Sequence, residues 1–142
     1  MKNLEPEIYR QRLIIEAKYT IKVERETVRK YLLDLIEFMG MTIHPQQPEP
    51  IITSATGKSK PLHDGYEGFC FWLESGVSIY IWERYNFLSI DIYSCKKFDR
   101  QEALNFTTDF FKISQVEFQE TIPSQEKVWV DKESPCQTLK NL

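Results

Sequence analysis

The sequence contains no apolar run long enough to cross a bilayer, and its polar start, Met1 to Gln11, has no apolar signal core. It also lacks an excess of positive charge, because 18 lysines and arginines are set against 21 acidic residues, which leaves a net charge of −3. The basic residues are interspersed with acids instead of forming a patch. We therefore expect an intracellular, cytoplasmic protein that binds neither nucleic acid nor an anionic membrane.

Cysteine and histidine are scarce as well. The three cysteines, Cys70, Cys95 and Cys136, show no CxxC spacing and no even-numbered framework, so we expect neither a zinc site nor a disulfide scaffold. Any functional thiol then acts singly. The two histidines, His44 and His63, lie in or near predicted loops without a spacing partner. We predict no metal site, and His63 is the better of the two as a candidate base.

The sequence does contain enough apolar material for one hydrophobic core. Of its 142 residues, 42% are hydrophobic and 13% are aromatic, which is typical of a single globular domain. We assign residues 1–122 to this domain and residues 123–142 to a C-terminal tail.

Two segments have the period of an amphipathic helix. From Glu26 to Met39 apolar residues recur at helical spacing, and Gly40 follows where a left-handed cap is needed. The second helix begins after Asp99, a favourable N-cap residue. Its predicted buried positions are Ala103, Phe106, Thr107 and Phe110.

Five segments have the length and residue types of strands, and the three in the middle are joined by turns at Ser75-Gly76 and at residues 84–86. The predicted strands are Leu13–Val23, Tyr66–Leu73, Val77–Glu83, Phe87–Cys95 and Gln115–Ile122. Thr42–His44 is a candidate for a further short strand. The prolines that follow it and the run Thr53–Lys60 are typical of a loop, which we interpret as a lid.

This order of elements predicts an α+β fold. The three central strands form an antiparallel meander, and the two helices connect its ends to the outer strands. We expect a two-layer sandwich in which both helices cover one face of a single antiparallel sheet.

The period of two along the meander separates two faces. One face is aliphatic and suits packing under the helices: Val77, Ile79, Ile81, Leu88, Ile90 and Ile92. The other mixes aromatic, hydroxyl, carboxylate and thiol groups: Ser78, Tyr80, Trp82, Phe87, Ser89, Asp91, Tyr93 and Cys95. This second face is neither core nor simply solvated, and we interpret it as a ligand site or a contact with a second copy of the chain.

The Glu74-Ser75 pair, the aromatic strand ending in Trp82, and the Ile-Asp-Ile-Tyr-Ser-Cys run that ends at Cys95 resemble the bacterial and archaeal S-adenosylmethionine decarboxylases. The resemblance has no gap from Glu67 to Cys95 and extends more loosely over Arg12 to Ile122. Ser75 and Cys95 stand twenty residues apart, and the chemistry of the family requires both residues.

The resemblance implies a chain that cuts itself. In the family, the serine at the position of Ser75 attacks the carbonyl of the preceding glutamate, here Glu74, and becomes a pyruvoyl group at a new chain start. That group serves as an electron sink while S-adenosylmethionine loses carbon dioxide, a step of spermidine and polyamine biosynthesis. The cysteine at the position of Cys95 returns a proton to the product. The family also implies a homodimer or a higher homo-oligomer.

Several positions depart from the family. Tyr80 stands where a histidine assists self-cleavage, and a phenol is a poor base at neutral pH. Glu67 replaces a serine that also helps cleavage, and Arg84 replaces the glutamate that grips the ribose hydroxyls. We keep Tyr80 as a candidate catalytic residue, and Trp82, Glu67, Arg84 and Tyr66 as candidate substrate contacts.

Three hypotheses follow. The first is a pyruvoyl-dependent decarboxylase acting on S-adenosylmethionine or, because the ribose contact is lost, on a basic amino acid such as arginine or ornithine. The second, favoured by Tyr80 and Glu67, is an unprocessed relative that binds or regulates. The third is an enzyme that uses the same cleft for other S-adenosylmethionine chemistry. Without the resemblance, Glu74-Ser75-Gly76 is an ordinary hairpin turn and Cys95 a small buried hydrophobe.

Overall fold

The centre of the molecule is one six-stranded sheet. The computed structural model describes residues 2–55 and 63–123. The strand order is β2-β3-β4-β5-β1-β6, and every neighbouring pair in it is antiparallel. The strands are β1 (Gln11–Lys18), β2 (Ile51–Ala55), β3 (Gly65–Trp72), β4 (Ser75–Trp82), β5 (Phe87–Ser94) and β6 (Gln115–Thr121).

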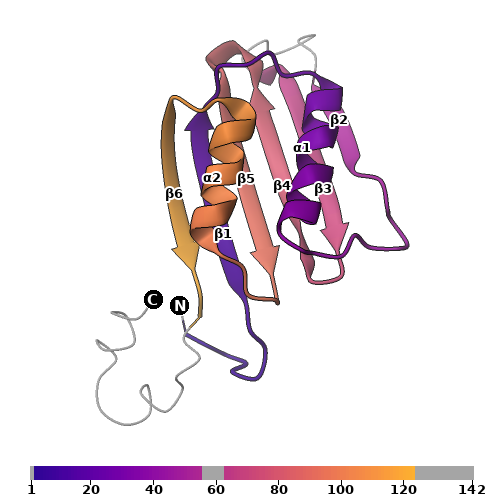
Figure 1. Ribbon diagram of the computed structural model, residues 1–142, viewed down its shortest axis with the longest axis vertical. Coiled ribbons are helices and arrows are strands. Elements are labelled where there is room, and N and C mark those ends of the chain that lie inside the picture. Colours follow the sequence, from indigo (N-terminus) through magenta and orange to yellow (C-terminus); the bar gives the residue numbers. More distant parts are fainter. Residues whose placement is uncertain (1, 56–62, 124–142) are drawn as a thin grey trace.

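Two helices, α1 (Arg25–Phe38) and α2 (Arg100–Phe111), cover the same face of this sheet (Figure 1). The opposite face carries no layer of described residues, and we call it the open face. The predicted two-layer α+β sandwich is confirmed.

The faces of the meander are also as predicted. The aliphatic positions of β4 and β5 are all buried, because each points into the core under the helices: Val77, Ile79, Ile81, Leu88, Ile90 and Ile92. The strand β1 adds Leu13 and Ile15 to the same layer. Gly68 of β3 lies directly beneath α1, where an added Cβ would come within 3.0 Å of Leu32. The helix therefore packs against the sheet backbone at that point.

One end of each helix follows the predicted signal. Gly40 closes α1 with a left-handed φ of 66°, which costs glycine little because it has no Cβ. The side chain of Asp99 caps α2 by accepting a hydrogen bond from the Glu102 N–H at 3.0 Å. Such a cap typically stabilises a helix by about 1 kcal/mol.

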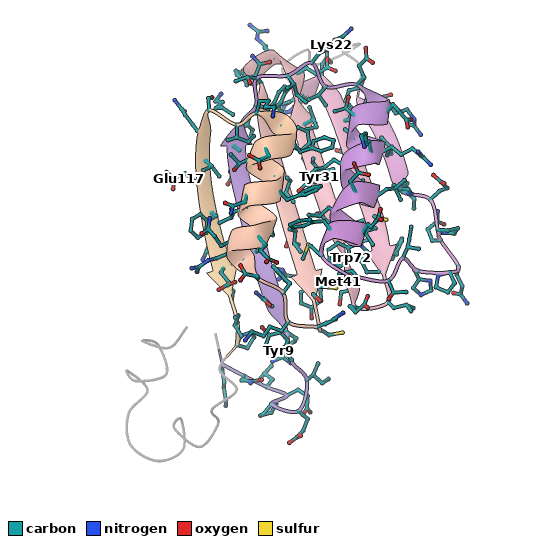
Figure 2. All side chains as sticks on the ribbon, viewed as in Figure 1. Tyr9, Lys22, Tyr31, Met41, Trp72 and Glu117 are labelled. Atoms are coloured by element: carbon teal, nitrogen blue, oxygen red, sulfur yellow. The ribbon has the colours of Figure 1, made fainter. Side chains whose placement is uncertain are left out.

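The two helices meet around Tyr31, which Figure 2 shows between them. Its hydroxyl and that of Thr107 lie 2.8 Å apart and form a hydrogen bond, and its ring packs against Phe110 and Phe111 at centroid distances of 5.2 and 4.8 Å. Both Tyr31 and Thr107 are buried. The hydrogen bond satisfies the one polar group that this aromatic cluster contains.

The predictions differ from the structure around the first strand and the long loop. The first strand ends at Lys18, where its pairing with both β5 and β6 stops. Residues 51–55, partly assigned to a loop, form the edge strand β2. Pro50 lies just before this strand and therefore removes no ladder hydrogen bond. Thr42–His44 makes a single bridge, between Ile43 and Trp72. Residues 56–62 of the predicted lid and the predicted tail beyond Pro123 lie outside the described residues.

Candidate functional site

The hairpin between β3 and β4 turns two residues earlier than the sequence predicts. Trp72 pairs with Ser75, so the turn consists of Leu73 and Glu74, and Ser75 is the first residue of β4. Ser75 has a φ of 139°, a region of backbone conformation that is essentially restricted to glycine. A strained residue of this kind costs on the order of 1–3 kcal/mol. The Glu74-Ser75 peptide bond therefore leads into a strained residue.

Gly76 has a different reason to be glycine from the turn that we predicted. An added Cβ would lie 2.9 Å from the carbonyl oxygen of Cys70 and 3.1 Å from the ring of Phe69. The missing side chain allows the neighbouring strand and its phenyl ring to approach closely. Packing, and not turn geometry, accounts for this residue.

The carbonyl of Glu74 is held by the strand on the other side of β4. The backbone N–H of Cys95 donates to this oxygen at 2.8 Å, one step beyond the last pair of the β4–β5 ladder, which is Ser75 with Ser94. The carbonyl belongs to the peptide bond between Glu74 and Ser75. A donor fixed against it can stabilise negative charge that develops on the oxygen when the carbonyl carbon is attacked.

Ser94 fixes the backbone that carries this donor. It is fully buried, and its hydroxyl accepts from the Lys96 N–H at 2.9 Å while lying 2.7 Å from the Lys96 carbonyl oxygen, to which it donates. These two contacts close a short turn around Cys95. Ser94 thereby orients the Cys95 N–H toward Glu74.

The side chain of Glu74 is tied to the segment that follows α1. Thr42 donates its N–H to Glu74 Oε2 at 3.0 Å and accepts the Leu73 N–H at 2.9 Å. Partial burial acts to raise the pKa of Glu74, but the hydrogen bonds from the Thr42 backbone and from its own N–H, with the charge of Lys96, outweigh burial and lower the pKa. The carboxylate is thus a charged anchor for the turn.

Of the two cysteines in the described part of the chain, Cys95 is the accessible one. It lies beside the Glu74-Ser75 bond, not buried as a small hydrophobe would be. Cys70 is buried, and burial with the charge of Glu49 raises its pKa to about 11. Cys136 lies outside the described residues. Cys95 is therefore the thiol available for chemistry at this site.

A second group of predicted residues lies toward the other end of the same strands. Glu67 pairs with Tyr80 across β3 and β4, and both line a cavity of about 260 Å³ together with Trp82 and His63. Tyr80 is five residues from Ser75 along β4, which is roughly 16 Å at about 3.3 Å per residue. Tyr80 and Glu67 therefore do not reach Ser75 of their own chain.

The remaining predicted contacts lie apart from both groups. Tyr66 pairs with Ile81 and packs against the core on the helix-covered side, although it borders the same cavity. Arg84 is exposed in the 3₁₀ turn η2 (Glu83–Tyr85) that follows β4. The sequence does not single out Ser94, Thr42 or Lys96. Ser94 could have been inferred from its place directly before Cys95 in the run that resembles the family, whereas nothing local marks Thr42.

Two features are absent from the described residues. No cluster of three or more His, Cys, Asp or Glu side chains there is arranged to hold a metal ion. Neither described helix has the length and apolar character that a membrane span requires.

These observations place the chain in the class of two-layer α+β sandwiches that carry a strained serine and an accessible cysteine at one end of the sheet. A sequence profile of the family described as S-adenosylmethionine decarboxylase matches residues 14–122. The chain therefore belongs to the S-adenosylmethionine decarboxylase family. No match was found among curated proteins.

The fold is similar to that of a solved adenosylmethionine decarboxylase. The crystal structure of the adenosylmethionine decarboxylase from Aquifex aeolicus VF5 matches with a TM-score of 0.64 and 16% sequence identity. The match covers 89% of this chain and 97% of that one. At 16% identity the likeness establishes the fold alone. The low sequence identity is consistent with a divergent member of the family.

Proposed function

We propose that the chain cleaves itself between Glu74 and Ser75 and then acts as a pyruvoyl-dependent decarboxylase. The observation that carries this proposal is the pairing of a strained Ser75, with its φ of 139°, and a Glu74 carbonyl that accepts the Cys95 N–H at 2.8 Å. Strain raises the energy of the intact chain, and the donor lowers the energy of the oxyanion that forms during attack.

The cleavage begins at the serine itself. The Ser75 hydroxyl attacks the carbonyl carbon of Glu74, the peptide C–N bond breaks, and the nitrogen takes up the proton, which gives an ester. Elimination then removes the Cα proton of Ser75 and releases the Glu74 carboxylate. Hydrolysis of the resulting dehydroalanine releases ammonia and leaves a pyruvoyl group at the new chain start.

The residues around Ser75 fit a pyruvoyl group derived from it. When present, the group supplies an electron sink for loss of carbon dioxide from an amine-bearing substrate. Cys95 is exposed beside the same bond, where its thiol can return a proton to the product carbon. The turn around Ser94 holds Cys95 at this position.

For the substrate we propose S-adenosylmethionine, with a basic amino acid such as arginine or ornithine as the competing choice. Family membership supports the first. A basic amino acid is supported by Arg84, which is exposed in η2 at the position of the family's ribose-binding glutamate. Arginine has no carboxylate that could accept hydrogen bonds from the two ribose hydroxyls. The reaction with S-adenosylmethionine would supply polyamine biosynthesis.

We also propose that the chain works as a homodimer that pairs the open faces of two sheets. Side chains on the β2–β4 part of this face are unusually apolar and exposed, at 37–47% of their maximum: Ile51, Phe69, Phe71 and Tyr80. Exposed apolar patches of this kind mark association surfaces. A second copy turned end for end would bring its Tyr80 and Glu67 toward Ser75, which these residues cannot reach within one chain.

The alternative function is that of an unprocessed relative that binds a small molecule or regulates a partner, or that uses the cleft for other S-adenosylmethionine chemistry. The separation of Tyr80 from Ser75 and the poor basicity of a phenol favour it. The cavity beside Glu67, Tyr80 and Trp82 is then the candidate binding site.

Intact mass spectrometry of the purified protein decides between these functions. Cleavage gives fragments of 74 and 68 residues (142 − 74 = 68), and the second fragment carries a blocked, pyruvoyl start. Ser75→Ala is the matched control and must stay whole. A wild-type chain that also stays whole after prolonged incubation rules out the self-cleaving function.

For a cleaved chain, release of carbon dioxide from S-adenosylmethionine, arginine and ornithine identifies the substrate. Cys95→Ala should be cleaved yet turn over substrate at a strongly reduced rate. Full turnover in this variant refutes the proton-donor role. For an uncleaved chain, calorimetry with S-adenosylmethionine and methylthioadenosine tests the binding alternative directly.

A further inference from the structure

A cavity of about 300 Å³ opens on the part of the open face that β5, β1 and β6 form, away from the residues proposed above for dimerisation. Among the residues that line it are Arg10, Arg12, Ile14, Tyr93, Gln119 and Thr121. The sheet order explains how residues so distant in sequence meet, because Arg12 pairs with Tyr93 on one side and with Thr121 on the other.

The guanidinium of Arg12 is held in place before any ligand arrives. The central carbon of the Arg12 guanidinium lies 4.7 Å from the centroid of the Tyr93 ring. The Nε atom of Arg12 lies 3.3 Å from Asp91 Oδ1, which makes an ion pair that lacks hydrogen-bond geometry. Nη1 and Nη2 of Arg12 have no hydrogen-bond partner among the described residues. Stacking on an aromatic ring fixes the plane of this two-pronged donor at little further entropic cost.

The other residues that line the cavity also favour a negatively charged ligand. The lining residues that the structure describes include two arginines and no carboxylate. Arg10 is held by neutral acceptors, Asn3 Oδ1 at 2.6 Å and the Glu5 carbonyl at 3.3 Å, so its charge is not neutralised by these contacts. The amide of Gln119 and the hydroxyl of Thr121 line the same cavity and make no other side-chain hydrogen bond to described residues.

The cavity also has an apolar part, formed by Ile14 and the ring of Tyr93. Inorganic anions gain nothing from such a surface, whereas an organic acid with a flat or aliphatic body buries apolar area against it. We propose that this pocket binds the carboxylate of a small organic acid, with the carboxylate on the Nη groups of Arg12 and the body over Tyr93 and Ile14. We call it the Arg12 pocket.

The test uses full-length protein carrying Ser75→Ala, so that the outcome does not depend on self-cleavage. Benzoate is the probe, followed by two-dimensional amide NMR, and benzamide is the neutral control of the same shape. We expect benzoate to shift the backbone signals of Arg12, Tyr93 and Gln119 in a saturable way and benzamide to leave them unchanged. Shifts confined to other parts of the chain, or equal shifts with benzamide, overturn the proposal.

Two further arms separate the sources of binding. Arg12→Gln should weaken benzoate binding about tenfold or more, because a bidentate charged contact is lost. The control is Arg100→Gln, which removes an ion pair between α2 and Glu120 of β6 and should not weaken benzoate binding. Phosphate that binds as tightly as benzoate contradicts the role of the apolar surface. If Arg12→Gln does not fold, the wild-type shift pattern alone decides.

Discussion

The carbonyl oxygen of Glu74 lies 2.8 Å from the backbone nitrogen of Cys95, which donates a hydrogen bond to it. Glu74 directly precedes β4 and Cys95 directly follows β5, so this contact requires the whole β4–β5 hairpin to be in register. It links the bond that we propose is cut to the residue that we propose transfers the proton. Any change that shifts the register therefore affects both steps.

Replacing Ser75 by glycine should stabilise the protein relative to Ser75→Ala by about 1 kcal/mol or more, because glycine adopts a φ of 139° without strain. Both variants lack the hydroxyl, so neither is cut and the comparison is of intact chains. Urea unfolding measures the difference.

The matched control is Ser78, which lies three residues further along β4 and has an ordinary backbone conformation. There Ser78→Gly should be less stable than Ser78→Ala by roughly 0.5–1 kcal/mol, since glycine loses more backbone freedom on folding. If glycine destabilises both positions equally, Ser75 is not strained.

Ser94→Val should slow self-cleavage by about tenfold or more, because loss of the hydroxyl releases the turn that aims the Cys95 N–H at the Glu74 carbonyl. Ser94→Thr keeps the hydroxyl and should retain most of the rate. Cleavage is followed by intact mass over time. A Ser94→Val protein that is less stable but cleaves at the wild-type rate contradicts the positioning role.

Tyr80→His should accelerate self-cleavage, because imidazole is a far better base than a phenol at neutral pH. Tyr80→Phe is the control and should not accelerate it. A second experiment mixes chains that carry both Tyr80→His and Ser75→Ala with wild-type chains. Faster cleavage of the wild-type chain in the mixture shows that the base acts across the dimer, and an unchanged rate argues against this.

Stability should fall at alkaline pH. Burial, with a contribution from Glu83, raises the pKa of Tyr19 to about 12, and burial raises the pKa of Tyr31 well above its ordinary 10.0. Both phenols stay neutral in the folded protein while the unfolded chain ionises near pH 10.0. Their contribution is complete below that pH and is lost as the pH rises toward the folded-state values.

Tyr31→Phe tests this assignment. Loss of the hydrogen bond with Thr107 should cost about 1 kcal/mol at neutral pH. The free energy of unfolding should then fall less steeply above pH 10.0 than in the wild type, because one buried phenol no longer titrates. Urea unfolding across this pH range provides the comparison, and equal slopes count against Tyr31.

Much of the fold could be predicted because its signals are local. The period of two in β4 and β5 and the period near 3.6 in α1 sort residues into buried and exposed sets without knowledge of partners. Gly40 and Asp99 marked helix ends for the same reason, since a cap depends on its own few neighbours. The edge strand β2 was missed because adjacent prolines and polar residues obscure a short pattern.

The sequence by itself determined the layers and one end of each helix, and it carried the resemblance of Glu74, Ser75 and Cys95 to the family. Only the tertiary structure decided that Ser75 is strained, that the Glu74 carbonyl meets the Cys95 N–H, and that Tyr80 lies too far along β4 to assist within one chain. It also placed β1 between β5 and β6, which creates the Arg12 pocket. The physical reason is that strand order and register depend on pairing between distant segments, which no local pattern encodes.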